Sequence, residues 1–126
     1  MKLIKLTPDF EEDRGSITDL FYDDNINHVT HITTTDISAV RGNHFHKETT
    51  QAMYMTKGSL IYWYKDLDGE EVKSIRVNEG EIVVTPPNQI HALTFDEKND
   101  FIVFTWGLRG GKDYESDTFR VDSIVS

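Results

Sequence analysis

The stretch RGNHFHKETTQ, at residues 41–51, contains the residues that decide the fold. His44 and His46 are two positions apart in a segment with strand character, and side chains two apart in a strand point to the same side. A short turn of four residues then allows Gln51 to return on a neighbouring antiparallel strand, beside the two imidazoles. Far downstream, His91 begins another predicted strand. We expect these four side chains to meet at one point inside the protein.

The rest of the chain shows the same strand character. Short runs rich in β-branched and aromatic residues alternate with turn signals, and sustained apolar spacing of three and four is nearly absent, so the pattern predicts an all-β protein. The segments 66–69 and 78–80 contain residues that tolerate positive φ and are predicted to be hairpin turns. The predicted strands are Lys2–Leu6, Ser16–Phe21, Asn27–Thr33, Gly42–His46, Gln51–Thr56, Ser59–Lys65, Glu71–Val77, Glu81–Thr85, His91–Phe95 and Phe101–Gly107.

Length and composition limit the classes of function. With 126 residues, 37% of them apolar, the chain is expected to form a single domain, residues 1–126. The 22 acidic residues against 13 basic ones give a net charge of −9, which disfavours nucleic acid as a partner. There is no cysteine, so a transition-metal site has to be built from imidazole, carboxylate, amide or water. Lysines interrupt the amino-terminal apolar residues, so we expect no membrane span and a cytoplasmic protein.

The spacing around the histidines resembles the two motifs of the cupin superfamily. The positions that follow the two motifs are His44, His46, Gln51 and Gly58, then Gly80, Pro86, Asn88, His91 and Phe95, where Gln51, Asn88 and Phe95 replace the usual Glu, Gly and Asn. The resemblance implies a single-domain cupin, a double-stranded β-helix or jelly-roll barrel. It also implies one divalent metal ion (Fe, Mn, Ni or Zn) bound by His44, His46, Gln51 and His91. The change to Gln51 removes a negative charge but keeps a carbonyl oxygen, so the metal is expected to be held less tightly.

A narrower resemblance points to sugar nucleotides. Residues 41–47 resemble the RGxHxHK signature of the dTDP-4-keto-6-deoxyglucose 3,4-ketoisomerases and of the cupin domain of capsular-polysaccharide biosynthesis reductases. Residues 13–15 and 117–119 are similar to segments of the related dTDP-4-dehydrorhamnose 3,5-epimerases. The resemblance implies an isomerase or epimerase that moves a proton beside a ketone, with a nucleotide sugar as substrate and a homodimer as the assembly. It implies His44 or His46 as the base, Arg41 or the metal beside the oxyanion, and Arg14 and Arg109 at the diphosphate.

Other interpretations of the same residues remain open. The histidines can act as a base without a metal, or form a polar barrel interior, and Arg14 and Arg41 can form ordinary surface salt bridges. A metal-dependent dioxygenase or lyase acting on a small molecule is the second enzymatic hypothesis, and a non-catalytic module that binds a small ligand is the third. Sugar-nucleotide chemistry predicts that the arginines converge on the pocket, whereas oxygenase chemistry predicts a mainly apolar pocket.

Overall fold

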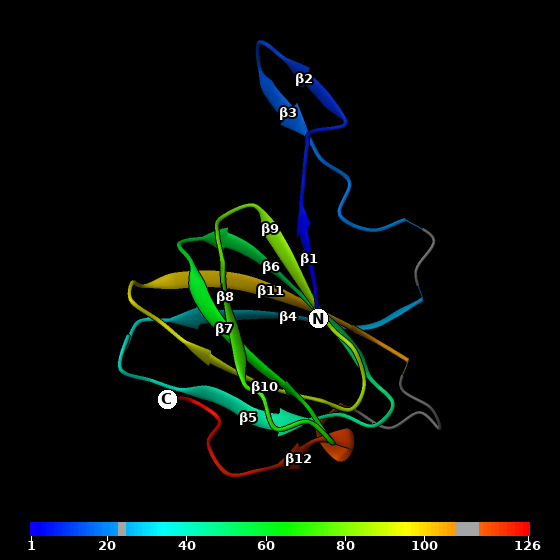
Figure 1. Ribbon diagram of the computed structural model, residues 1–126. Coiled ribbons are helices and arrows are strands. Elements are labelled where there is room, and N and C mark those ends of the chain that lie inside the picture. Colours follow the sequence, from blue (N-terminus) through cyan, green and yellow to red (C-terminus); the bar gives the residue numbers. More distant parts are fainter. Residues whose placement is uncertain (23–24, 108–113) are drawn as a thin grey trace.

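The computed structural model describes residues 1–22, 25–107 and 114–126, and in these ranges strands predominate (Figure 1). One short 3-10 helix, η1, covers Tyr114–Asp117. No helix in the described part of the chain is long and apolar enough to cross a lipid bilayer. The strands are β1 (Lys2–Lys5), β2 (Phe10–Glu12), β3 (Gly15–Ile17), β4 (Ile26–Thr34), β5 (Arg41–Phe45), β6 (Thr50–Lys57), β7 (Leu60–Asp66), β8 (Lys73–Val77), β9 (Glu81–Thr85), β10 (Gln89–Thr94), β11 (Asn99–Trp106) and β12 (Phe119–Arg120).

Two five-stranded sheets form the body of the protein. The first has the strand order β1-β9-β6-β11-β4 and the second has the order β12-β5-β10-β7-β8, with every pairing antiparallel. The sheets face each other (Figure 1), so the central strands bury one side against the opposite sheet. Strand β11 shows this most clearly, because its residues alternate between buried and half-buried along its whole length. The predicted all-β fold is confirmed.

The hydrophobic core fills one part of the space between the sheets. Its buried members are Met53, Met55, Leu60, Tyr62, Val77, Val83, Leu93, Phe95, Phe101 and Val103. Phe95, which replaces the usual Asn of the second motif, packs in this core and is not among the described residues that line the pocket. The remaining space between the sheets forms the pocket described below, and His44, His46 and His91 line it.

The predicted hairpin between residues 59–65 and 71–77 is confirmed, because β7 pairs with β8. The hairpin predicted at residues 78–80 is wrong: β8 and β9 belong to different sheets, and this turn carries the chain across the barrel. Turn residues favour a reversal of the backbone, but they do not specify whether the next strand pairs or crosses over. The segment predicted as a strand from residue 16 to 21 ends at Ile17, and strands β2 and β12 were not predicted.

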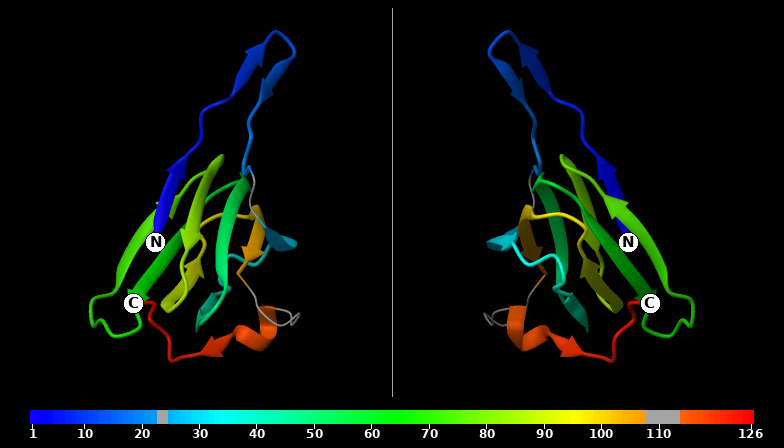
Figure 2. Two further views of the ribbon diagram at one scale, coloured as in Figure 1. Left: turned by 90° about the vertical axis from the view of Figure 1, so that its right-hand side faces the viewer. Right: turned by 90° about the vertical axis from the view of Figure 1, so that its left-hand side faces the viewer.

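Two segments lie at the periphery of the fold (Figure 2). The hairpin β2–β3 projects from one end of the barrel, and its apolar side chains Phe10 and Ile17 are 53% and 61% exposed. The carboxyl-terminal segment, from η1 onward, lies along the edge of the second sheet, where β12 pairs with β5. Only the second of these segments contributes side chains to the pocket of its own chain.

Candidate active site

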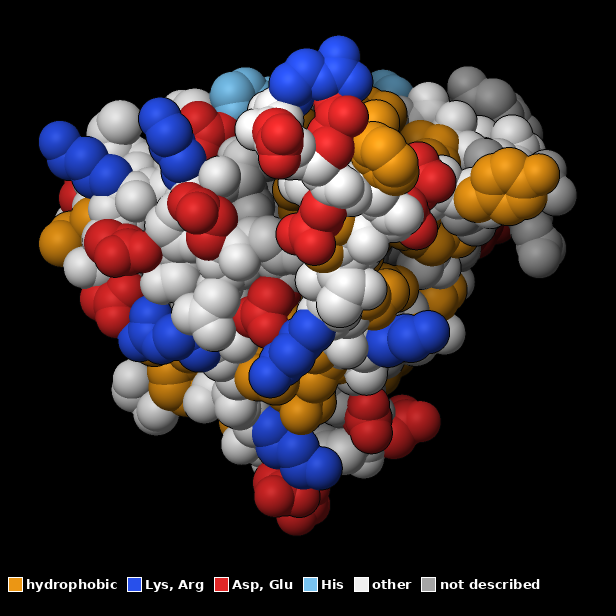
Figure 3. All heavy atoms as spheres, turned by 90° about the horizontal axis from the view of Figure 1, so that it is seen from above, with side chains coloured by type: hydrophobic (Ala, Val, Ile, Leu, Met, Phe, Trp, Pro, Cys, Tyr) orange, Lys and Arg blue, Asp and Glu red, His pale blue; other side chains and the backbone are white. Residues whose placement is uncertain are grey.

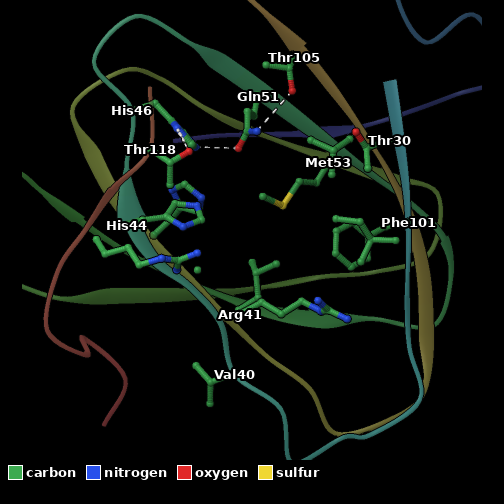
Figure 4. A pocket seen from close by; sticks show the side chains of 16 residues that line it. Thr30, Val40, Arg41, His44, His46, Gln51, Met53, Phe101, Thr105 and Thr118 are labelled. Atoms are coloured by element: carbon green, nitrogen blue, oxygen red, sulfur yellow. Dashed lines mark hydrogen bonds between the residues drawn. The ribbon is translucent and has the colours of Figure 1, made fainter. Parts of the chain in front are cut away.

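A pocket of about 640 Å³ lies between the two sheets. Strands β4, β6 and β11 of the first sheet line one side, strands β5 and β10 line the other, and the carboxyl-terminal segment adds Thr118 and Arg120. One end of the pocket is polar and contains the histidines, whereas Met53 and Phe101 belong to an apolar wall (Figure 4). None of the described lining residues is acidic, although the chain carries a net charge of −9.

Strand pairing brings the three predicted imidazoles together. His44 in β5 and His91 in β10 are direct partners across the ladder, and their ring centroids are 4.6 Å apart. His46 directly follows β5, and its ring lies 5.0 Å from that of His44 and 5.6 Å from that of His91. Each ring offers one nitrogen that could bind a metal ion, and these three nitrogens all lie within 4.8 Å of one another. The sequence prediction that these histidines converge agrees with this placement.

Gln51 reaches the same cluster from the opposite sheet. Its Oε1 lies 3.1 Å from Nε2 of His46, and its amide nitrogen donates to the hydroxyl of Thr105 at 3.3 Å (Figure 4). Both Gln51 and Thr105 are buried. The cluster therefore spans both sheets, with three imidazoles from one and an amide from the other.

Glycine at position 42 permits the close approach of β5 to β10. Its φ is 89°, and a Cβ atom there would lie 2.8 Å from the carbonyl oxygen of His91 and 3.0 Å from Cα of Ala92. Real Cβ atoms essentially never make the first contact, and the second is tighter than most that they make, so a side chain would push β10 away. Gly42 thus determines the distance between the strands that carry His44 and His91. Asn88, which replaces the usual Gly of the second motif, also has a positive φ, of 62°.

We expect Gly42→Ala to lower the free energy of unfolding by about 2 kcal/mol or more, because strain at positive φ adds to the displacement of the His91 backbone. The control is Gly80→Ala, since Gly80 has a similar φ of 83° but no described atom within 4 Å of a Cβ there. Gly80→Ala should lose only the part of the unfolding free energy that comes from strain at positive φ. Urea denaturation of both variants measures the difference, and equal losses would contradict a role for close strand packing.

Burial keeps two of the imidazoles neutral. Burial, with smaller effects of positive charge on His46 and Arg120, lowers the pKa of His44 from 6.5 to about 4. Burial, with smaller effects of His44 and His46, lowers the pKa of His91 to about 3. Neutral imidazoles offer lone pairs that accept a proton or bind a metal ion.

These shifts make stability depend on pH. The unfolded chain takes up protons at these histidines near pH 6.5 and the folded chain does so only near pH 4 and 3, so stability is fully present above pH 6.5 and is lost as the pH falls. For His91 the loss is on the order of 3 kcal/mol between pH 7 and 4. We expect the unfolding free energy of metal-free protein to decline over this range and His91→Asn to flatten the decline. An equally steep decline in the variant would refute this assignment.

The donor set fits a divalent metal ion. Nδ1 of His44 is buried and has no hydrogen-bond partner within the described ranges. Nδ1 of His46 donates to the carbonyl of Asp117 at 2.9 Å, so its Nε2 carries a lone pair that faces Oε1 of Gln51. Two acceptors at 3.1 Å require a cation or a proton between them, unless the Gln51 amide is turned by 180° and donates. A cation between Nε2 and Oε1 fits a metal site, whereas a turned Gln51 amide that donates to Nε2 fits a metal-free histidine site.

The arginines divide into those that reach the pocket and those that do not. Arg41 lines the pocket, and its guanidinium donates to the backbone carbonyl of Thr33 at 3.1 Å and to the hydroxyl of Thr34 at 3.2 Å. Arg14 lies between β2 and β3, is exposed and pairs with Glu12, so the structure does not bring it to the pocket of its own chain. Arg109 lies outside the described residues.

Arg120 is a pocket residue that sequence reasoning missed. It faces His44 across the β12–β5 ladder and lines the pocket beside it. Strand β12 has two residues, too few for a periodic pattern, so the sequence carried no signal for this placement. Among the residues that the structure describes, two arginines therefore line the pocket, one from β5 and one from the carboxyl-terminal segment.

Comparisons with known proteins agree with the fold. A family model described as polysaccharide biosynthesis C-terminal domain matches residues 10–119. A variant of the 3,4-ketoisomerase of Thermoanaerobacterium thermosaccharolyticum, solved in complex with TDP, is 27% identical, with a TM-score of 0.76 over 95% of this chain and 86% of that one. A 3,4-ketoisomerase from Helicobacter canadensis is 23% identical, with a TM-score of 0.78 over 95% and 90% of the two chains.

A further solved structure has the same fold. The dTDP-4-dehydrorhamnose 3,5-epimerase of Sulfolobus tokodaii is 18% identical, with a TM-score of 0.74 over 98% of this chain and 80% of that one. No curated protein sequence matches this chain. The predicted cupin fold, and the resemblance to cupins that act on sugar nucleotides, are confirmed by these structures.

Proposed function

Because the chain belongs to the polysaccharide biosynthesis C-terminal domain family, we propose that it isomerises or epimerises a sugar nucleotide by moving a proton beside a ketone. The structures it resembles include sugar 3,4-ketoisomerases and a 3,5-epimerase, one of them a ketoisomerase variant in complex with TDP-4-keto-6-deoxyglucose. One observation of this chain carries the proposal: a pocket without described acidic residues combines three clustered imidazoles with two arginines.

The arginines provide the affinity for a diphosphate. A guanidinium pairs with phosphate oxygens through two parallel hydrogen bonds, and Arg41 and Arg120 are both exposed at the pocket, where an incoming anion meets them. The Thr33 and Thr34 contacts hold the Arg41 guanidinium in place before a ligand binds. The apolar wall around Met53 and Phe101 is suited to the less polar parts of the substrate.

His44 is the imidazole best placed to be the base. Both ring nitrogens of His46 lie near fixed groups, Asp117 and Gln51, and His91 is almost fully buried. His44 is only half-buried and lines the pocket, and its lowered pKa makes it neutral near pH 7. Negative charge that develops on the substrate beside it raises the pKa of the ring and so strengthens it as a base.

The reaction balances without an oxidant or reductant. His44 accepts the proton from the carbon next to the ketone, the C–H electrons form a carbon–carbon double bond, and the carbonyl oxygen becomes an enediolate oxyanion. Arg41 stabilises this oxyanion through its guanidinium. Return of a proton to the other face of the same carbon gives an epimer. Protonation of the former carbonyl carbon and of its oxygen, with loss of the hydroxyl proton from the neighbouring carbon, makes that neighbour the new ketone and gives the ketoisomer.

We also propose that His44, His46, Gln51 and His91 hold one divalent metal ion, of the group Fe, Mn, Ni and Zn. Imidazole nitrogens and an amide oxygen are suitable ligands for these ions, and the unpaired Nδ1 of His44 supports the assignment. When bound, the ion supplies Lewis-acid stabilisation of the oxyanion. An ion bound by all three imidazoles leaves none of them free to act as the base, so elemental analysis of the purified protein also decides between this metal site and His44 as the base.

We expect Gln51→Glu to raise affinity for Zn²⁺ by about tenfold or more, because it adds a negative charge within reach of the three imidazoles. Isothermal titration of metal-free protein with Zn²⁺ measures the change. The control is Glu81→Gln, which alters charge at an exposed turn where Glu81 accepts from the backbone of Asn78. Unchanged affinity in Gln51→Glu, or no binding by either protein, would speak against this metal site.

The direct test of the proposed function is incubation of the purified protein with dTDP-4-keto-6-deoxyglucose and with other nucleotide-linked ketosugars. NMR spectroscopy identifies the product. A ketoisomer or epimer that forms only with active protein supports the proposal. Binding of TDP without turnover of any ketosugar would instead indicate a ligand-binding module, and consumption of dioxygen would indicate the oxygenase alternative.

A homodimer is the assembly we propose. An isolated two-stranded hairpin is marginally stable in water, yet β2–β3 projects from the barrel with Phe10 and Ile17 exposed. The face seen from above, on the side of this hairpin, has apolar side chains among acidic and basic ones (Figure 3). A second copy is the partner expected to cover the hairpin. A molar mass from light scattering of twice the chain mass of 14.5 kDa supports the dimer, and a molar mass equal to that of one chain contradicts it.

A further inference from the structure

One buried carboxylate ties the carboxyl-terminal segment to the loop after β5. Asp117, the last residue of η1, is only 6% exposed. Its Oδ1 accepts the backbone N–H of Lys47 at 3.1 Å, and its Oδ2 accepts those of Glu48 and Thr49 at 2.9 Å each. The hydroxyl of Thr49 donates to the same oxygen. Three successive backbone amides thus converge on one carboxylate, an arrangement that binds anions strongly.

The backbone of the same residue holds a ring of the histidine cluster. The carbonyl oxygen of Asp117 accepts the Nδ1–H of His46 at 2.9 Å. The side chain of Asp117 therefore anchors the loop that begins next to His46, while its main chain orients the imidazole. Because 71 positions separate the two residues, this contact exists only when the carboxyl-terminal segment is docked.

The hydrogen bond selects the form of the imidazole. A neutral ring carries one proton, and a proton on Nδ1 that is donated to a carbonyl leaves the lone pair on Nε2. In His46 this Nε2 lies 3.1 Å from Oε1 of Gln51, at the polar end of the pocket, so in metal-free protein the Nδ1–H form goes with a Gln51 amide turned by 180°, whose nitrogen donates to Nε2. The opposite form, with the proton on Nε2, would place two acceptors, Nδ1 and the carbonyl, against each other.

We propose that Asp117 is a positioning residue that keeps His46 in the Nδ1–H form, with the Nε2 lone pair directed into the pocket. The carboxylate acts through the loop and the backbone carbonyl, not by contact with substrate. The part of this inference that concerns activity rests on the proposed function, whereas the form of His46 does not. A purely structural anchor would stabilise the loop without determining where the proton on His46 resides.

The test is nitrogen-15 NMR spectroscopy of the histidine rings in metal-free protein, with no substrate present. In the parent protein, the coupling pattern of His46 should show the proton on Nδ1. In Asp117→Ala, and to a smaller extent in Asp117→Asn, the His46 signals should move toward the Nε2–H form or a mixture of both. The ketoisomerase or epimerase activity should fall by about tenfold or more, mainly in kcat.

Two further variants keep the test decisive. Thr49→Val removes one of the four donors to the carboxylate, and it should shift the His46 signals in the same direction by a smaller amount. This variant provides the test if Asp117→Ala fails to fold. Asp96→Asn removes an exposed carboxylate that pairs with Arg76, and it should leave the His46 signals unchanged. Unaltered His46 signals in folded Asp117 variants, or an Nε2–H form in the parent, would overturn the inference. A changed form in a protein that converts no ketosugar would overturn only the proposed function.

Discussion

Replacement of His44 by glutamine should lower kcat by about a thousandfold while binding of TDP stays within about threefold of the parent value. Removal of a general base typically costs two to four orders of magnitude in rate. Glutamine keeps a polar side chain of similar reach but does not accept a proton near pH 7. Steady-state kinetics with the ketosugar that the protein converts, and titration with TDP, measure the two quantities.

A matched histidine variant completes this experiment. His31 lies on the outer side of β4, is exposed and pairs with Asp100, so His31→Gln changes the same residue type away from the pocket. Its kcat should equal that of the parent. If His44→Gln retains full turnover, the base is another residue, and the assignment of His44 is contradicted.

The second large effect concerns the two arginines. The double variant Arg41→Gln and Arg120→Gln should bind TDP about a hundredfold more weakly or worse, because each charge-assisted hydrogen bond contributes about 1.5–3 kcal/mol. Each single variant should lose about tenfold. Isothermal titration calorimetry at fixed ionic strength measures these affinities, since screening by salt weakens all such contacts.

Arg76 provides the control for charge. It pairs with Asp96 on the surface through two hydrogen bonds, at 3.2 and 2.6 Å, and does not line the pocket. Arg76→Gln removes the same charge from the chain, and TDP affinity should stay unchanged. An equal loss in this control would show that net charge, not the two pocket guanidiniums, determines binding.

The histidine cluster was predictable because strand geometry converts spacing into position. Residues two apart share a face, so His44 and His46 were fixed relative to each other before the fold was known. The second motif then placed His91 on a neighbouring strand, where it is the cross-strand partner of His44. Gln51 was found in the same way, through the length of the turn after His46.

Other parts of the site were not predictable, because they depend on contacts between distant segments. Strand β12 is too short for a periodic signal, so neither Arg120 nor the contact of Asp117 with His46 had a local signature. Arg14 was assigned through resemblance to a family, and the structure places it on the projecting hairpin instead. The turn at residues 78–80 was misinterpreted because its composition is the same for a hairpin and for a crossing between sheets.

The most direct test of proton transfer beside a ketone is exchange with solvent. The protein is incubated in D₂O with dTDP-4-keto-6-deoxyglucose, and the sugar is examined by NMR spectroscopy and mass spectrometry. We predict deuterium at the carbon next to the ketone, formed with the parent protein and with His31→Gln but not with His44→Gln. Absence of deuterium after prolonged incubation, across a panel of nucleotide-linked ketosugars that bind to the pocket, would contradict the proposed chemistry.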